Sequence, residues 1–139
     1  MKLESAAQGG TASEWDFPLT MNGGVATLSS RMLMAMAMEE LADAQPGDER
    51  AIRNIAASFQ YNLARGIARI ATDAASREGM RRIALSGGVA YNQAIRETIR
   101  TEIIGRGFGF VTNTDYPLGD GCVSYGQCVY AGMLLKKRG

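Results

Sequence analysis

The sequence contains no histidine and only two cysteines among its 139 residues. Without histidine, the chain cannot form a Ser-His-Asp or Cys-His catalytic arrangement by itself, and a bound metal must rely on oxygen ligands or on groups from elsewhere. Cys122 and Cys128 are too few for a disulfide framework, and they cannot complete an ordinary four-ligand zinc site. We therefore expect two small, buried, structural thiols.

Long apolar runs and an excess of charge are also missing. The longest apolar stretch, Met32 to Met38, is far shorter than the roughly 20 residues that cross a bilayer. The N-terminus lacks the apolar core of a signal peptide. Fifteen basic residues balance fourteen acidic ones, and only Lys136, Lys137 and Arg138 form a basic run. We expect a cytoplasmic protein that binds neither nucleic acid nor membrane.

Hydrophobic residues make up 46% of the chain, which is enough for the core of one soluble domain over residues 1–139. Near its start, residues 1–7 fit the end of a helix that Gly9-Gly10 would stop. Apolar residues between Trp15 and Leu28 flank Asn22-Gly23-Gly24. This pattern predicts a strand, a tight turn and a short second strand.

Two helices are expected next. The first follows the serines at 29 and 30 and ends near Ala44, with its methionines serving as adaptable core. Asp48 is expected to cap the second, which runs to about Glu78. One apolar stripe recurs along it at every third or fourth residue, formed by Ile52, Ile55, Ala56, Phe59, Leu63, Ile67, Ile70, Ala71 and Ala74.

The second half of the chain is predicted to be a β-α-β-α unit. Residues 81–85 and 108–112 fit short strands, residues 91–104 fit a helix, and a last helix starts near Ser124 and ends at a basic terminus. This order favours a parallel pair of strands with helices on its faces.

A glycine turn follows the first of these strands. Gly87 and Gly88 would let the backbone approach an anion closely, and Ser86 adds a hydroxyl donor beside free N–H groups at a helix start. Asn92, one helical turn into the next helix, could bond a purine or a ribose. Taken by spacing alone, the glycine pair also fits an ordinary tight turn, and Asn92 also fits a solvated polar position.

A second loop follows the second strand. Gly119 and Gly121 flank Asp120 and free the backbone to aim its carboxylate into a crevice, where it could hold a hard cation. An aspartate between glycines is also a common turn. Both loops are expected at the carboxyl ends of neighbouring strands, which is where open α/β sheets bind ligands.

These motifs resemble those of a known family. Residues 83–92 look like the SGGVxxN motif of the carbamoyltransferases that include HypF, the hydrogenase-maturation enzymes, and residues 117–127 look like their P-x-x-D-G-G-x-x-x-G-Q segment. Upstream, residues 55–64 are similar to the helix A-A-x-F-H-x-x-L-A, and residues 1–7 to A-M-x-L-E-x-x-A. The resemblance covers essentially the whole chain.

The resemblance implies an α/β fold with a mixed sheet flanked by helices, one lobe of an actin-like, sugar-kinase-like (ribonuclease H-like) ATPase. It also implies that residues 1–139 are a C-terminal fragment, inactive alone. Such enzymes use ATP, carbamoyl adenylate and a divalent metal, and they carbamoylate the C-terminal cysteine of a HypE-type partner for the cyanide ligands of nickel–iron hydrogenase. The metal would be shared with the missing lobe, and the isolated lobe could self-associate.

Residue by residue, the resemblance assigns phosphate binding to Ser86, Gly87 and Gly88, nucleoside binding to Asn92, and a metal ligand to Asp120. Gly119 and Gly121 are expected to belong to the same nucleotide- and phosphate-binding set. Two positions depart from the motifs. Gln60 stands where the helix motif has histidine, and Cys122 replaces the second glycine after Asp120. Two alternatives to a HypF-type enzyme are a non-catalytic lobe that binds nucleotide or a partner, and a related O-carbamoyltransferase.

Overall fold

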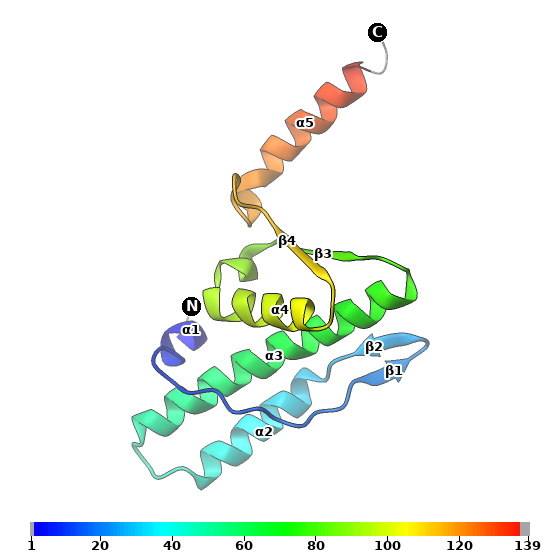
Figure 1. Ribbon diagram of the computed structural model, residues 1–139. Coiled ribbons are helices and arrows are strands. Elements are labelled where there is room, and N and C mark those ends of the chain that lie inside the picture. The colour runs from blue at the N-terminus through cyan, green and yellow to red at the C-terminus, as the bar shows by residue number, and fades with distance from the viewer. Residues whose placement is uncertain (1, 137–139) are drawn as a thin grey trace.

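The computed structural model describes residues 2–136 (Figure 1). Its helices are α1 (Lys2–Ala6), α2 (Ser30–Asp43), α3 (Glu49–Arg77), α4 (Gln93–Gly105) and α5 (Val123–Lys136). Its strands are β1 (Thr20–Asn22), β2 (Val25–Thr27), β3 (Arg82–Leu85) and β4 (Gly109–Thr112). Single-turn 3-10 helices, η1 (Gly88–Tyr91) and η2 (Asp120–Cys122), precede α4 and α5. The expected elements are therefore present. Met1 and the basic residues 137 and 138, which the sequence places at the ends of the first and last helices, lie outside the described range.

The long helix α3 is the element against which α1, α2, α4 and β3 all pack (Figure 1). As predicted, Asp48 caps it, and the carboxylate accepts a hydrogen bond of 3.0 Å from the backbone N–H of Ala51. With 29 residues, α3 is about 43 Å long. It is long enough to carry separate hydrophobic clusters on different faces.

Two such clusters form the core. The first joins α3 to α4 and to the inner face of β3 and β4, and its buried members are Ala64, Ala68, Ile95, Ile99 and Ile103. The second lies between α2, α3 and the N-terminal segment, and its buried members are Trp15, Phe17, Leu33 and Ala37. Each fully buried isoleucine of α4 contributes about 1.5–3 kcal/mol to stability.

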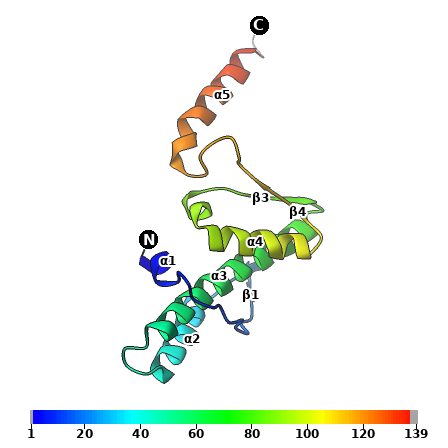
Figure 2. The ribbon, with the colours of Figure 1, turned by 60° about the vertical axis from the view of Figure 1, so that its left-hand side comes forward.

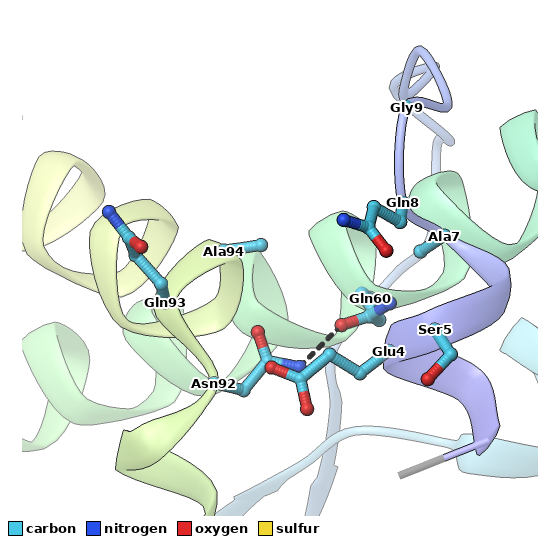
Figure 3. A pocket seen from close by; sticks show the side chains of 9 residues that line it. All are labelled: Glu4, Ser5, Ala7, Gln8, Gly9, Gln60, Asn92, Gln93 and Ala94. Carbon is cyan, nitrogen blue, oxygen red and sulfur yellow. Dashed lines mark hydrogen bonds between the residues drawn. The ribbon is translucent and has the colours of Figure 1, made fainter.

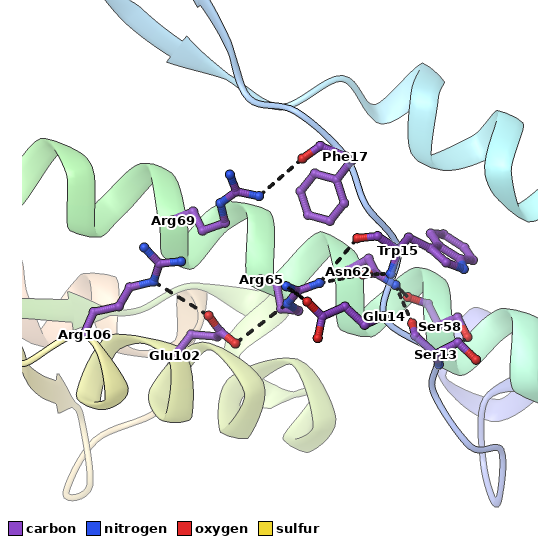
Figure 4. A network of polar contacts seen from close by, with 10 residues as sticks. All are labelled: Ser13, Glu14, Trp15, Phe17, Ser58, Asn62, Arg65, Arg69, Glu102 and Arg106. Carbon is purple, nitrogen blue, oxygen red and sulfur yellow. Dashed lines mark hydrogen bonds and ion pairs between the residues drawn. The ribbon is translucent and has the colours of Figure 1, made fainter.

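An extended segment, residues 11–17, runs along α3 and is held by a regular series of hydrogen bonds (Figure 4). The backbone N–H groups of every second residue donate to side chains four residues apart on the helix: Thr11 to Asn54 (2.8 Å), Ser13 to Ser58 (2.9 Å) and Trp15 to Asn62 (2.9 Å). We call these three bonds the ladder. They place Trp15 and Phe17 in the second cluster, so the first predicted strand begins at Thr20 rather than at Trp15.

The four strands form two separate sheets. β1 and β2 are antiparallel around the predicted turn, with Met21 opposite Ala26, and β3 and β4 are parallel, with Ile83 opposite Phe110. The expected parallel pair is confirmed. The expected single mixed sheet is not found within residues 2–136, because no strand pairing joins the β1–β2 hairpin to β3 or β4.

The last helix, α5, projects away from the body in both ribbon views (Figures 1 and 2). All its described residues are exposed, including Tyr130, Met133 and Leu135. The thiols also differ from expectation, since Cys122 is half-buried and Cys128 on α5 is exposed. No helix within the described range is long and apolar enough to cross a membrane.

Three of the four methionines of α2 depart from the expected core, whereas Met36 is half-buried and packs against the second cluster, as expected. Leu33 and Ala37, one turn apart, are the buried residues of this helix, while Met32, Met34 and Met38 are between 41% and 56% exposed. α2 packs on α3 through one side only. The methionines on its other sides therefore form surface.

Candidate functional site

The glycine turn after β3 is built against the second predicted loop. The backbone N–H of Gly87 donates to the carbonyl oxygen of Leu118 at 2.6 Å, and the hydroxyl of Ser86 donates to the same oxygen at 3.2 Å. Gly87 has φ +105°, a conformation that L side chains rarely adopt. The turn therefore requires glycine at 87, and two predicted anion donors are already bonded within the protein.

Gly88 differs from Gly87 because neither its backbone conformation nor its neighbours require a glycine at this position. Its φ is not in the positive region, and a Cβ added there would meet no atom within 4 Å. Gly88 opens η1, whose last residue, Tyr91, accepts a hydrogen bond at its hydroxyl from the backbone of Gly119. The space beside the Gly88 backbone is thus open to a ligand.

The second loop closes on the first from the other side. The backbone N–H of Gly119 donates to the hydroxyl of Tyr91 at 3.2 Å, and a Cβ at Gly119 would stand 3.0 Å from the Tyr91 ring and 3.6 Å from Cα of Gly88. Gly121 has only ordinary neighbours in Pro117. The structure thus brings the two predicted loops into direct contact at the carboxyl ends of β3 and β4.

Asp120 is exposed at the first position of η2. Among the described residues, no three histidine, cysteine, aspartate or glutamate side chains cluster closely enough to hold a metal ion. Asp120 therefore offers one carboxylate and, within residues 2–136, is not part of a group of side chains that could hold a metal ion by itself. The thiol of Cys122 bonds the carbonyl oxygen of Gly119 at 3.3 Å, so this departure from the motif is accommodated within the loop.

The loop continues into α5 through an aromatic pair. The rings of Tyr116 and Tyr125 stack with centroids 4.3 Å apart, and their hydroxyls are 2.8 Å apart. The hydrogen bond to Tyr116 raises the pKa of the Tyr125 hydroxyl, because ionisation would break that bond. This pair fixes the start of α5 to the loop that carries Asp120.

Asn92 does not lie one turn inside the helix, as the sequence suggested. It is the N-cap of α4, because η1 delays the helix start to Gln93. The Oδ1 atom of Asn92 accepts from the backbone N–H of Ile95 at 3.1 Å, and its Nδ2 donates to Oε1 of Gln60 at 2.6 Å. The side chain is 3% exposed and is not a solvated polar residue.

Asn92 and Gln60 lie side by side on the wall of an open pocket of about 640 Å³ (Figure 3). Its lining is polar and apolar in about equal parts and comes from α1, from the turn after it, from α3 and from the start of α4: Glu4, Ser5, Ala7, Gln8, Gly9, Gln60, Asn92, Gln93 and Ala94. The N-terminal end of α4 gives this region a positive potential. Sequence reasoning missed the pocket as a site, although Glu4 stands in one of the family-like motifs.

Together, the parallel strands, the paired glycine loops and the pocket beside Asn92 define an α/β domain whose candidate site includes the carboxyl ends of β3 and β4. Residues 1–127 match the family model described as carbamoyltransferase, Kae1-like domain, second subdomain. The chain belongs to this carbamoyltransferase family.

Individual relatives agree with this family. The chain is similar to the crystal structure of HypF from Thermococcus kodakarensis, with a TM-score of 0.74 and 34% identity over 99% of this chain and 17% of that one. It is 37% identical over 67 residues to "Probable carbamoyltransferase HypF" of Methanocaldococcus jannaschii, covering 48% of this chain and 9% of the relative.

The chain is also similar to a relative whose name gives a different activity. The tRNA N6-adenosine threonylcarbamoyltransferase of Rhizobium meliloti is 30% identical over 118 residues, which is 78% of this chain and 32% of the relative. The chain therefore spans a minor part of the length of each of these three proteins. Of the three, the Thermococcus kodakarensis structure matches 99% of this chain, and the Methanocaldococcus jannaschii protein matches 48% of it.

Proposed function

We propose that this chain forms the nucleotide-binding wall of a carbamoyltransferase active site whose donor is carbamoyl adenylate. The observation that carries the proposal is the direct contact between the two motif loops, made by Gly87 with Leu118 and by Gly119 with Tyr91. Ligands of α/β domains bind at such loops, and the pocket beside Asn92 offers room for a nucleoside.

We propose a role for each candidate residue of the two loops and the pocket. The open space at Gly88 admits a phosphate group near the start of η1, with Ser86 and Gly87 shaping the turn from behind. Asn92 presents its amide to the nucleoside. Gly119 and Gly121 keep the second loop close to the first, and Asp120 provides one oxygen ligand to a divalent metal that is completed by residues outside this chain.

As the finer part of the proposal, the acceptor is the C-terminal cysteine of a HypE-type protein. Its thiolate sulfur attacks the carbamoyl carbon, the bond from that carbon to the phosphate oxygen breaks, and AMP leaves with the bonding electrons. The product serves the cyanide ligands of nickel–iron hydrogenase. The similarity to two HypF proteins supports this acceptor.

The substitution Gly88→Ala tests the phosphate role directly. The added methyl group meets no protein atom, so the free energy of unfolding should change by less than about 0.5 kcal/mol, while it occupies space that a phosphate needs. We expect ATP affinity to fall at least tenfold in the carbamoyltransferase that contains this chain, as measured by calorimetry.

The matched control is Gly105→Ala at the far end of α4, which also has open space and no positive φ. ATP affinity should be unchanged in this control. Equal affinities for the wild type and Gly88→Ala would contradict phosphate binding at this loop.

Asp120→Ala tests the metal-ligand role. Because Asp120 is exposed, the substitution should leave the fold intact and abolish carbamoyl transfer together with divalent-metal dependence of ATP binding. Asp115→Ala, an exposed carboxylate in the same connection, serves as the control. Unaltered transfer in Asp120→Ala would refute the assignment.

A second candidate acceptor is the N6 atom of an adenosine in tRNA, with a threonylcarbamoyl donor. The 30% identity to the Rhizobium meliloti enzyme over most of this chain favours it. The two candidates separate in one assay that offers the same enzyme a HypE-type C-terminal cysteine and a tRNA, with radiolabelled carbamoyl or threonylcarbamoyl groups followed to the product.

A further inference from the structure

Gln60 is a polar side chain in the middle of α3 that is only 3% exposed. Its Nε2 donates to the carbonyl oxygen of Leu3 in α1 at 3.2 Å, and its Oε1 accepts from Nδ2 of Asn92 at 2.6 Å. Figure 3 shows the second of these bonds on the pocket wall, between α3 and the start of α4. One buried amide thus ties three helices together.

These bonds fix which way the carboxamide of Asn92 points. Its oxygen faces the N–H of Ile95, and its nitrogen faces the oxygen of Gln60. The reverse orientation would set donor against donor at Ile95 and acceptor against acceptor at Gln60, and buried polar groups left in that state are costly.

We propose that Gln60 is a positioning residue that sets the orientation of Asn92, and with it the shape of the pocket, by presenting an acceptor to Asn92 and a donor to α1. The second N–H of the Asn92 amide then stays available to a ligand. Leu3 belongs to the helix that supplies Glu4 and Ser5 to the pocket, so Gln60 sets the opposite wall as well. Only the identity of that ligand as a nucleotide rests on the proposed function.

The proposal depends on the order of donor and acceptor at position 60, which makes it testable with ionisable replacements. A neutral imidazole has one donor and one acceptor nitrogen, whereas its protonated form has two donors. A protonated carboxylic acid has one donor and one acceptor oxygen, whereas the carboxylate has acceptors only. Gln60→His should therefore reproduce the native bonds when uncharged at high pH, and Gln60→Glu when uncharged at low pH.

Few other groups titrate near this position. Among the described residues that line the two cavities bordered by Gln60, the titratable side chains are Glu4 from α1 and Tyr61 from α3 itself. The residues that α4 contributes to these cavities, Asn92, Gln93, Ala94 and Thr98, carry none, and neither do those of the turn after α1. Because the chain has no histidine, the new imidazole is also the single one in the variant.

The experiment follows the Asn92 carboxamide and the Ile95 backbone amide by NMR of the 15N-labelled chain across pH. The wild type gives the baseline that contains any contribution from Glu4 and Tyr61. Relative to it, the Gln60→His cross-peaks should match the native positions above the pKa of the imidazole, ordinarily about 6.5, and depart below it. The Gln60→Glu cross-peaks should depart above the pKa of the carboxyl and return below it.

Asn62→Asp is the matched control, since it places an ionisable group at another buried amide of α3 that holds the extended segment instead of the pocket. Its titration should leave the Asn92 signals in place. If both Gln60 variants show the same direction of pH dependence, or if their Asn92 signals follow the wild type throughout, position 60 only fills space and the proposal is wrong. Each variant should give native-like spectra at one end of the pH range. These spectra show that the variant is folded in the same sample.

A titration of the wild-type chain with AMP completes the test. Shifts at the Asn92 carboxamide on adding AMP support the nucleotide site. If AMP causes none while the two variants titrate in opposite directions, the positioning role of Gln60 stands. The nucleotide role is then decided by the ATP affinity of Gly88→Ala in the carbamoyltransferase that contains this chain.

Discussion

Asn92 shows how much a single polar side chain can organise. It caps α4, it binds Gln60, and it lines the pocket, all while almost fully buried. The helix-capping role was open to prediction, because asparagine before an amphipathic helix is a common N-cap. It was missed because η1 occupies the residues before it, and a 3-10 turn has no distinct sequence pattern.

Replacing Asn92 with alanine should destabilise the protein by about 0.5–2 kcal/mol, because the N–H of Ile95 loses its acceptor and Gln60 loses its donor. Asn92→Asp should recover part of this loss, since a carboxylate still accepts from Ile95 but cannot donate to Gln60. Urea denaturation measures both.

Ser29→Ala provides the comparison for this prediction. Ser29 caps α2 in the same way, accepting from the N–H of Met32 at 3.2 Å, but it is half-buried and does not line the pocket. Its loss should cost stability without changing ligand affinity. An equal loss of affinity in both variants would show that Asn92 acts only through global stability.

At the scale of elements, some features of α3 could be predicted from the sequence and others could not. The length and the cap of this helix were predictable from Asp48 and the apolar repeat. The repeat predicted one buried stripe, yet Ile52 and Ile67 are 46% and 38% exposed, while Ala64 and Ala68 are fully buried against α4. Alanine contributes little to the hydrophobic pattern of a sequence. A second packing face made of alanines therefore cannot be recognised from the spacing of large apolar residues.

Arg65 connects α3 to the extended segment and to α4 (Figure 4). It pairs with Glu14, donates to the carbonyl oxygen of Trp15 and to Asn62, and its Nε lies 3.8 Å from Glu102. Its guanidinium also lies over the rings of Phe17 and Tyr61. With a side chain only 14% exposed, it is a desolvated charge with several partners.

Arg65→Ala should therefore lower the free energy of unfolding by about 1–3 kcal/mol, because Glu14 and Asn62 lose a charged donor and the ring contacts disappear. Arg53→Ala removes an exposed pair with Glu49 on the same helix and should cost only a few tenths of a kcal/mol. Both values come from chemical denaturation. The prediction fails if the two substitutions cost the same.

At the scale of the molecule, the second half of the chain followed its sequence closely, because strand, glycine turn and helix alternate with clear boundaries. The sequence could not predict which faces of the sheet and of the helices are buried and which are exposed. The outer face of the parallel pair, with Ala84 and Val111, is exposed, and so is the whole of α5. Parallel sheets are normally covered on both faces, and helices apolar on all sides are normally buried.

From this exposure we predict that the isolated chain self-associates through α5. Tyr130 and Leu135 are 65% and 72% exposed, and burying a large apolar side chain is worth about 1.5–3 kcal/mol. Replacing either with lysine should weaken association roughly tenfold or more, as seen by sedimentation velocity.

The control for this prediction is Met80→Lys, which changes a side chain that is 60% exposed between α3 and β3. It should leave association unchanged. A wild-type chain that sediments as a monomer at every concentration would contradict the prediction.

The ladder along α3 also sets a limit on its own length. Two residues of extended chain advance about 6.6 Å, whereas four residues of helix advance about 6.0 Å. Each further bond of the ladder therefore adds about 0.6 Å to the offset between donor and acceptor. Three bonds tolerate this drift. The next helix position in the series is Gly66, which has no side chain to continue it, and Arg65 and Arg69 instead reach the carbonyl oxygens of Trp15 and Phe17 with long, adjustable arms. Inserting one residue between Thr11 and Trp15 would shift every later bond out of phase, so this short segment should tolerate substitutions at its exposed residues far better than changes in its length.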